Sequence, residues 1–147
     1  MISKNPMRRL AVILLAFPLI SAIGPTAVID VDVSGLRNQR GTLQVCLTRL
    51  PAHFPDCKGD PKALTGSVPA NRGHVQFQTV PPGQYAVSVF HDENSNRKLD
   101  RFMGIPREGF GFSRNPVIRF GPPRFDKVSI QLSPGYTRAG VRMQYLL

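Results

Sequence analysis

The chain has 147 residues and a formal net charge of +10, from 19 basic and nine acidic residues. That length suffices for one domain with one hydrophobic core and excludes two such domains. The basic charge is compatible with an anionic lipid, polysaccharide or nucleic acid partner, but the arginines are scattered along the chain, as on an ordinary solvated surface.

The first 27 residues have the pattern of a Sec-type signal peptide. Lys4, Arg8 and Arg9 precede an almost wholly apolar run, residues 10–23, which is short for a membrane span. Small residues follow, and we expect cleavage between residues 22 and 27; the alternative is an uncleaved N-terminal anchor. Cleavage at the later limit removes three basic residues and no acidic one, so residues 28–147 keep a net charge of +7 and no transmembrane span. This domain is expected in the periplasm or outside the cell.

Six segments alternate apolar and polar residues with the period of a half-buried strand. They are residues 28–33, 41–48, 74–80, 84–91, 125–132 and 140–146. We expect the first two to form a hairpin through the turn at 35–40. No ten-residue stretch after residue 27 has helical spacing, and Gly/Pro turns separate the segments. The pattern predicts an all-β fold, a single antiparallel β-sandwich of about seven strands.

Two longer segments are expected to connect these strands. Residues 49–70 contain the second of the two cysteines, Cys57, and Cys46 lies in the strand before them. An even count in an exported chain predicts a Cys46–Cys57 disulfide. Residues 101–125 carry five Phe and five Arg without a sustained period. We interpret the Phe residues as fastening a long loop onto a sheet, and disfavour the alternative, base stacking in a nucleic-acid site.

The most informative segment is an Asp/Asn-rich loop that follows the predicted strand 84–91. Asp92, Asn94, Asn96 and Asp100 occupy positions 1, 3, 5 and 9 of a calcium loop, with the Lys98 carbonyl at position 7. Such hard oxygen ligands converge on Ca²⁺ at about 2.3–2.6 Å. The spacing therefore predicts a cation site at the rim of the sheet.

Other features of the loop favour a metal-free alternative. Arg97 stands at position 6, where calcium loops have glycine with positive φ, and Met103 stands at position 12 in place of the usual bidentate Glu. Glu108 could replace that missing ligand if the chain folds back. The alternative is a turn in which Asp and Asn side chains accept hydrogen bonds from their own backbone amides. His91, which precedes the loop, is expected to pack against Phe112 or a loop carbonyl.

One long motif resembles a known bacterial family. It runs Val80-Pro81-Pro82-Gly83-Gln84-Tyr85-Ala86-Val87-Ser88-Val89-Phe90-His91-Asp92-Glu93-Asn94-Ser95-Asn96, with Leu99-Asp100 and Gly104 to Ser113, and continues through Gly121-Pro122-Pro123-Arg124-Phe125 to Tyr145. The family is domain of unknown function 2141. The turn and strand at 82–87 are also similar to carboxypeptidase-regulatory and transthyretin-like sandwiches. The resemblance implies an exported Ig-like or prealbumin-like β-sandwich and no established activity. The family tends to have Gly where Arg97 stands.

These observations predict an exported, non-catalytic binding or structural module of the cell envelope. Its predicted Ca²⁺ ligands are Asp92, Asn94, Asn96, the Lys98 carbonyl, Asp100 and Glu108. One alternative is a metal-free domain that binds an acidic glycan or lipid through a basic rim. Another is a hydrolase that uses Asp92, Asp100 and Glu108 as paired carboxylates. The chain has no Gly-x-Ser-x-Gly elbow and no His-rich metal cluster, so an enzyme is the less favoured reading.

Overall fold

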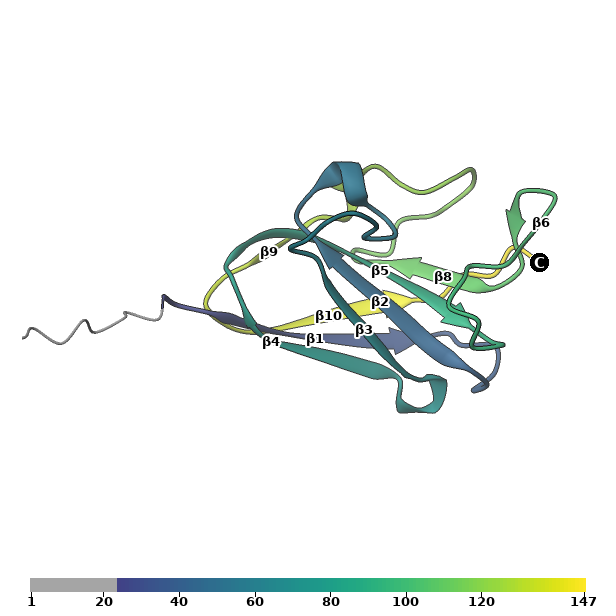
Figure 1. Ribbon diagram of the computed structural model, residues 1–147, viewed down its shortest axis with the longest axis horizontal. Coiled ribbons are helices and arrows are strands. Elements are labelled where there is room, and N and C mark those ends of the chain that lie inside the picture. The colour runs from purple at the N-terminus through teal and green to yellow at the C-terminus, as the bar shows by residue number, and fades with distance from the viewer. Residues whose placement is uncertain (1–23) are drawn as a thin grey trace, which may run out of the picture.

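The computed structural model describes residues 24–147, so the predicted signal peptide, apart from residues 24–27, lies outside the described part. The described chain is almost entirely β-structure (Figure 1). Its strands are β1 (Ala27–Ser34), β2 (Thr42–Thr48), β3 (Leu64–Pro69), β4 (His74–Val80), β5 (Gly83–Asp92), β6 (Arg101–Phe102), β7 (Ile105–Pro106), β8 (Gly109–Phe112), β9 (Ile130–Leu132) and β10 (Gly135–Arg142). Its helices are the 3-10 turns η1 (Pro51–His53) and η2 (Ala70–Arg72) and the single turn α1 (Phe125–Val128). The all-β prediction is confirmed.

Two sheets face each other across the main core. One has the strand order β10-β1-β4, and the other has the order β3-β2-β5-β8, with β9 paired to the start of β5. In Figure 1, β2 and β3 run obliquely across β1 and β10. The alternation in the sequence places Ile29 and Val31 of β1 and Leu43, Val45 and Leu47 of β2 in this core. Burial of these aliphatic side chains is the main stabilising contribution to the fold.

The prediction that the first two strands form a hairpin is wrong. β1 pairs with β4 and, in parallel, with β10, whereas β2 pairs with β3 and β5 in the other sheet. The chain between β1 and β2 therefore crosses from one sheet to the other instead of turning back. The parallel β1–β10 pair also means that the fold is not purely antiparallel, as the sequence had predicted.

The number of strands differs from the expected seven, since ten occur within residues 24–147. β3 lies in the segment expected to be a connection, and β6, β7 and β8 lie in the segment that lacked a period. The predicted strand at 125–132 is divided between α1 and β9. Val128 packs in an outer cluster while Leu132 lies in the main core, so these two residues do not share one face. The last strand begins at Gly135, five residues before its predicted start.

The part of the second sheet formed by β5 and β8 is buried on both faces because two connections cover its outer side. Phe110, Phe112 and Val128 form an outer cluster, against which Phe54 and Phe125 pack. The ring centroids of Phe54 and Phe112 are 5.5 Å apart. This explains why five consecutive residues of β5, 85–89, are buried without alternation. Of the five Phe residues in segment 101–125, Phe125 packs onto this cluster from α1, Phe110 and Phe112 belong to β8 of the sheet itself, and Phe102 and Phe120 are exposed. The predicted fastening of a loop therefore holds for Phe125 alone.

The predicted disulfide is present. Cys46 points to the outer face of β2, away from Leu43, Val45 and Leu47, and bonds to Cys57 with the two Cα atoms 5.9 Å apart. It ties the connection between β2 and β3 to the sheet beside the outer cluster. Neither of the two cysteines is free.

Replacing Cys46 and Cys57 together by serine is expected to lower the free energy of unfolding by about 3 kcal/mol, because the bond closes a loop of roughly a dozen residues in the unfolded chain. Urea denaturation of the oxidised protein and the double variant would measure this difference. A loss below about 1 kcal/mol would contradict the loop-entropy account.

Both apolar clusters are assembled from residues between Ala27 and Tyr145. A chain that begins at Gly24 therefore contains both clusters and all three sheets. Within that part of the chain, no helix has the length and apolar character needed to cross a membrane.

Candidate functional site

The rim of the second sheet begins where β5 ends at Asp92. The Asp92 side chain is fully buried. Its Oδ1 accepts a hydrogen bond from the Asn96 amide at 2.9 Å, and its Oδ2 accepts one from the Arg97 amide at 2.7 Å. Thr42 and Gln44 of the neighbouring strand lie at 3.5 Å from Oδ2. Asp92 thus caps the turn that follows it, as aspartate does in Asx turns.

The turn itself contains backbone strain at Arg97. This residue has a φ of +62°, in the left-handed region that favours glycine. The sequence placed Arg97 at the loop position that needs positive φ, and the structure confirms that conformation. The hydrogen bond from the Arg97 amide to Asp92 Oδ2 helps to hold Arg97 in this conformation.

Three predicted ligands lie together at the exposed side of the loop. The Asp100 carboxylate accepts hydrogen bonds from Asn94 Nδ2 at 2.7 Å and from Asn96 Nδ2 at 3.0 and 3.1 Å. These amide bonds, followed by the charges of Arg107 and Lys98, keep the pKa of Asp100 below its ordinary value. Asn96 Oδ1 in turn accepts the Lys98 amide at 2.8 Å.

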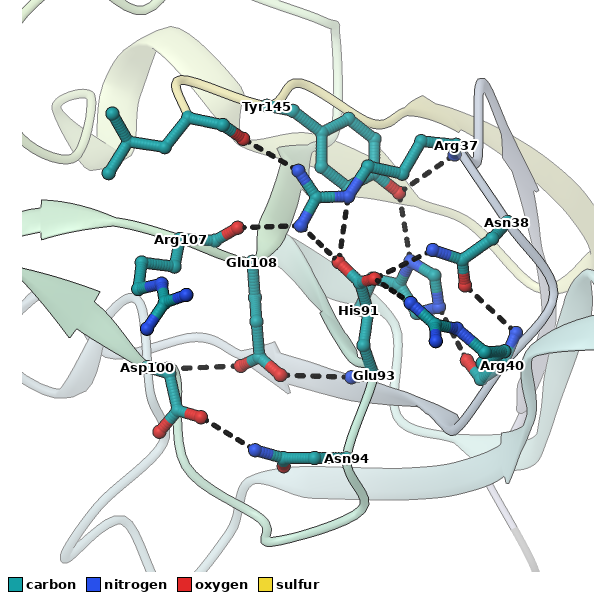
Figure 2. A network of polar contacts seen from close by, with 11 residues as sticks. Arg37, Asn38, Arg40, His91, Glu93, Asn94, Asp100, Arg107, Glu108 and Tyr145 are labelled. Carbon is teal, nitrogen blue, oxygen red and sulfur yellow. Dashed lines mark hydrogen bonds and ion pairs between the residues drawn. The ribbon is translucent and has the colours of Figure 1, made fainter.

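Glu108 occupies the floor of the rim. Its side chain is buried, and its two oxygens accept the amides of Glu93 at 2.9 Å and Asp100 at 3.0 Å. Figure 2 shows its carboxylate between these two backbone positions. The chain does fold back onto the loop, as the sequence analysis required. Glu108 holds the backbone at both ends of the loop.

His91 lies one residue before the loop and is fully buried. Its Nε2 is 2.7 Å from the Arg40 carbonyl oxygen and its Nδ1 is 2.8 Å from the Tyr145 hydroxyl. Since a carbonyl only accepts, Nε2 carries a proton and donates to Arg40, and Nδ1 and the Tyr145 hydroxyl form the second hydrogen bond of the ring. The expected contact with a loop carbonyl is confirmed. Burial raises the pKa of Tyr145, so its hydroxyl remains a donor.

An ion-pair network that the sequence did not predict adjoins His91. Arg37 Nη2 lies 2.6 Å from Glu93 Oε1, and Arg37 Cζ lies 4.7 Å from the centroid of the Tyr145 ring (Figure 2). The Arg37 guanidinium also donates to the carbonyl oxygens of Arg107 and Leu147. Burial alone would raise the pKa of Glu93, but a hydrogen bond from Asn38 and the Arg37 pair outweigh it and lower the pKa. No short-range motif identifies these residues, because the contacts span at least 55 positions of the sequence.

The predicted calcium ligands are thus partly gathered. Asn94, Asn96 and Asp100 converge, while the Asp92 and Glu108 carboxylates are directed at backbone amides. Within residues 24–147, no three His, Cys, Asp or Glu side chains form a metal-binding group. The predicted set combines three carboxylates with two Asn oxygens and a backbone carbonyl. A cation at Asp100 would require Asn94 and Asn96 to turn their amides, because both direct Nδ2 hydrogens at that carboxylate. The metal prediction stays a prediction.

Four exposed basic residues lie in the loop or follow it, namely Arg97, Lys98, Arg101 and Arg107. Within the described residues, none of the four takes part in an ion pair. Between residues 97 and 107 the only acidic residue is Asp100, which leaves a local net charge of +3. Asp92, Glu93 and Glu108 bring the formal charge of residues 92–108 to zero, but Asp92 and Glu108 are buried and Glu93 pairs with Arg37. The exposed side chains of this stretch are therefore predominantly positive.

Fold and site together define an all-β protein with a disulfide and a polar rim built from an Asx turn. A family model described as "Uncharacterized protein conserved in bacteria (DUF2141)" matches residues 31–139, and the chain belongs to this family. No curated protein and no solved structure matched the chain.

Proposed function

We propose that this protein is an exported, non-catalytic binding or structural module of the cell envelope, and that the rim around the Asp92–Asp100 loop is its binding edge. The Cys46–Cys57 disulfide supports export, because such bonds persist in oxidising compartments. The two facing sheets support an Ig-like or prealbumin-like sandwich as the scaffold. The proposal includes the signal peptide over residues 1–27.

The observation that carries this proposal is how the rim carboxylates are used. All four oxygens of Asp92 and Glu108 accept backbone amide hydrogen bonds. Both side chains are buried, so they fix the shape of the loop and do not face an open substrate cleft. This use supports a binding role over the hydrolase alternative, since a general base needs an oxygen that can reach a substrate proton.

We further propose that the loop binds Ca²⁺ through Asp92, Asn94, Asn96, the Lys98 carbonyl, Asp100 and Glu108. Three of these already converge without metal, and the sixth position already has the conformation that a calcium loop needs. The rival is the metal-free basic rim. The metal-free rim is supported by the side-chain amides of Asn94 and Asn96, which donate hydrogen bonds to the Asp100 carboxylate where a cation would otherwise bind.

Thermal melting in Ca²⁺ and in EDTA distinguishes the calcium site from the metal-free rim. Calcium at 100 times its dissociation constant is expected to add about 2.7 kcal/mol of stability, a melting-temperature increase of roughly 10 °C. Asp100→Asn should abolish the increase, whereas the exposed Asp126→Asn should leave it unchanged. No increase at millimolar Ca²⁺ in the wild type would contradict the calcium site and leave the metal-free rim.

A further inference from the structure

A small hairpin rises directly from the Asx loop. Among the strands of residues 24–147, β6 and β7 pair only with each other, in the register Arg101 to Pro106 and Phe102 to Ile105. Figure 1 shows β6 standing away from the two main sheets. The base of the hairpin is fixed, since the Arg107 amide donates to the Asp100 carbonyl at 2.8 Å and Glu108 accepts the Asp100 amide. The hairpin is thus a projecting element on a rigid base.

The hairpin presents apolar side chains to solvent at its tip. Phe102 is 57% exposed, Met103 87% and Ile105 43%. Phe102 and Ile105 are cross-strand partners and therefore lie on the same face. Exposed apolar residues are common singly, but three within four positions at a projecting turn form a patch that indicates an interaction site.

The turn sequence itself is unfavourable for folding. Met103 and Gly104 both have positive φ, at +49° and +82°, as in the type I′ turns of two-residue hairpins. The first central position of such a turn favours Asn, Asp or Gly, and an unbranched apolar residue there is strained. The chain places Met103 at this position although it packs against little. Strain of this kind is typical of functional sites.

We propose that the β6–β7 hairpin docks the protein onto an anionic lipid surface, with Phe102, Met103 and Ile105 entering the interfacial region. Lys98, Arg101 and Arg107 lie beside or in the hairpin along the chain and supply the charge complementarity, because they are exposed and lack ion-pair partners within the described chain. An acidic glycan would satisfy the charges but not the apolar tip, so the combination favours lipid. This inference rests on the proposed binding edge but not on calcium.

The protein has no tryptophan, so a single introduced indole reports only its own position. In a chain beginning at Gly24, Met103→Trp is expected to shift its emission to the blue with vesicles of phosphatidylcholine and phosphatidylglycerol, and not with phosphatidylcholine alone. Phe120→Trp, at a site 96% exposed in another loop, is the matched control and should not shift. Equal shifts at both sites, or none at Met103→Trp, would overturn the assignment of the hairpin. A shift that depends on protein concentration without vesicles would identify self-association instead.

Vesicle sedimentation separates the apolar from the charged contribution. Phe102→Ala is expected to lower partitioning roughly tenfold, and Arg101→Glu about fivefold or more. Phe120→Ala and Arg119→Glu are the corresponding controls and should have little effect.

Met103→Asn should reduce partitioning while leaving the melting temperature equal or higher, because Asn suits the turn. If Arg101→Glu abolishes binding and Phe102→Ala leaves it unchanged, binding is purely electrostatic and insertion is ruled out. Vesicle binding that persists in EDTA, with no calcium-dependent melting, would remove the calcium site and retain the hairpin.

Discussion

Replacing Glu108 by alanine is expected to lower the free energy of unfolding by about 3–5 kcal/mol, since two charge-assisted hydrogen bonds of roughly 1.5–3 kcal/mol each are lost and two amides are left without their acceptor. The carboxylate is buried and holds the amides of Glu93 and Asp100, which flank the Asx loop. Urea denaturation would measure the loss. Faster hydrogen exchange at these two amides would locate it at the rim.

Two further variants test this explanation. Glu108→Gln should give an intermediate loss, because its amide oxygen can accept one bond while its NH₂ faces the other donor. Asp126→Ala is the control, since Asp126 makes an exposed ion pair with Arg124, and it should cost no more than about 1 kcal/mol. A Glu108→Ala variant as stable as Asp126→Ala would mean that the loop does not depend on Glu108.

The sequence was a good guide to strands whose apolar residues alternate with polar ones. The predicted strand at 74–80 coincides with β4, and the predicted 84–91 differs from β5 by one residue at each end. In β4 one face lies in the core, so the period of the backbone appears directly in the residue types. β5 is buried on both faces over residues 85–89, and its extent followed instead from the apolar run and the polar loop that ends it. Pairing between strands was less predictable, because alternation does not specify which neighbour a strand meets.

Two of the missed strands, β3 and β8, share a physical cause, which is close approach at glycine. In β8, a Cβ on Gly111 would lie 2.7 Å from Val141 Cγ1 and 2.8 Å from the Arg142 carbonyl oxygen. In β3, a Cβ on Gly66 would lie 2.8 Å from Val75 Cγ1. Glycine on one face of a strand lets the other sheet pass close by, but it contributes no apolar or polar signal to the pattern. These strands therefore resemble loops in the sequence.

The candidate site likewise has a part that could be predicted from the sequence and a part that could not. The Asx turn was predictable because Asp92, Asn94 and Asn96 act on backbone amides within five residues. The Arg37, Glu93 and Tyr145 contacts depend on the crossing of the chain between the two sheets, which the hairpin prediction had misplaced. Their positions follow from tertiary structure and not from a local motif.

Gly41 is the position at which a single added carbon should be most damaging. It has a φ of +70°, and a Cβ there would overlap the Asp92 carbonyl oxygen and lie 2.7 Å from the carbonyl carbon of Glu93. Both neighbours are backbone atoms in or beside β5, so neither can rotate away. Gly41→Ala is therefore expected to cost about 4 kcal/mol or more, from left-handed strain of roughly 1–2 kcal/mol together with overpacking. Thermal and urea denaturation would measure this loss.

Gly121 separates the two contributions to that cost. Its φ is +64°, close to that of Gly41, but a Cβ there would meet nothing within 4 Å. Gly121→Ala should therefore cost only the strain of about 1–2 kcal/mol, and the difference between the two variants measures how tightly the start of β2 abuts the end of β5. Because Asp92 begins the Asx turn at this contact, Gly41→Ala should also speed hydrogen exchange at the Asn96 and Arg97 amides, whereas Gly121→Ala should not. Equal losses in the two variants would show that the β2–β5 contact at the rim is loose, and that the loop is not held from below by Gly41.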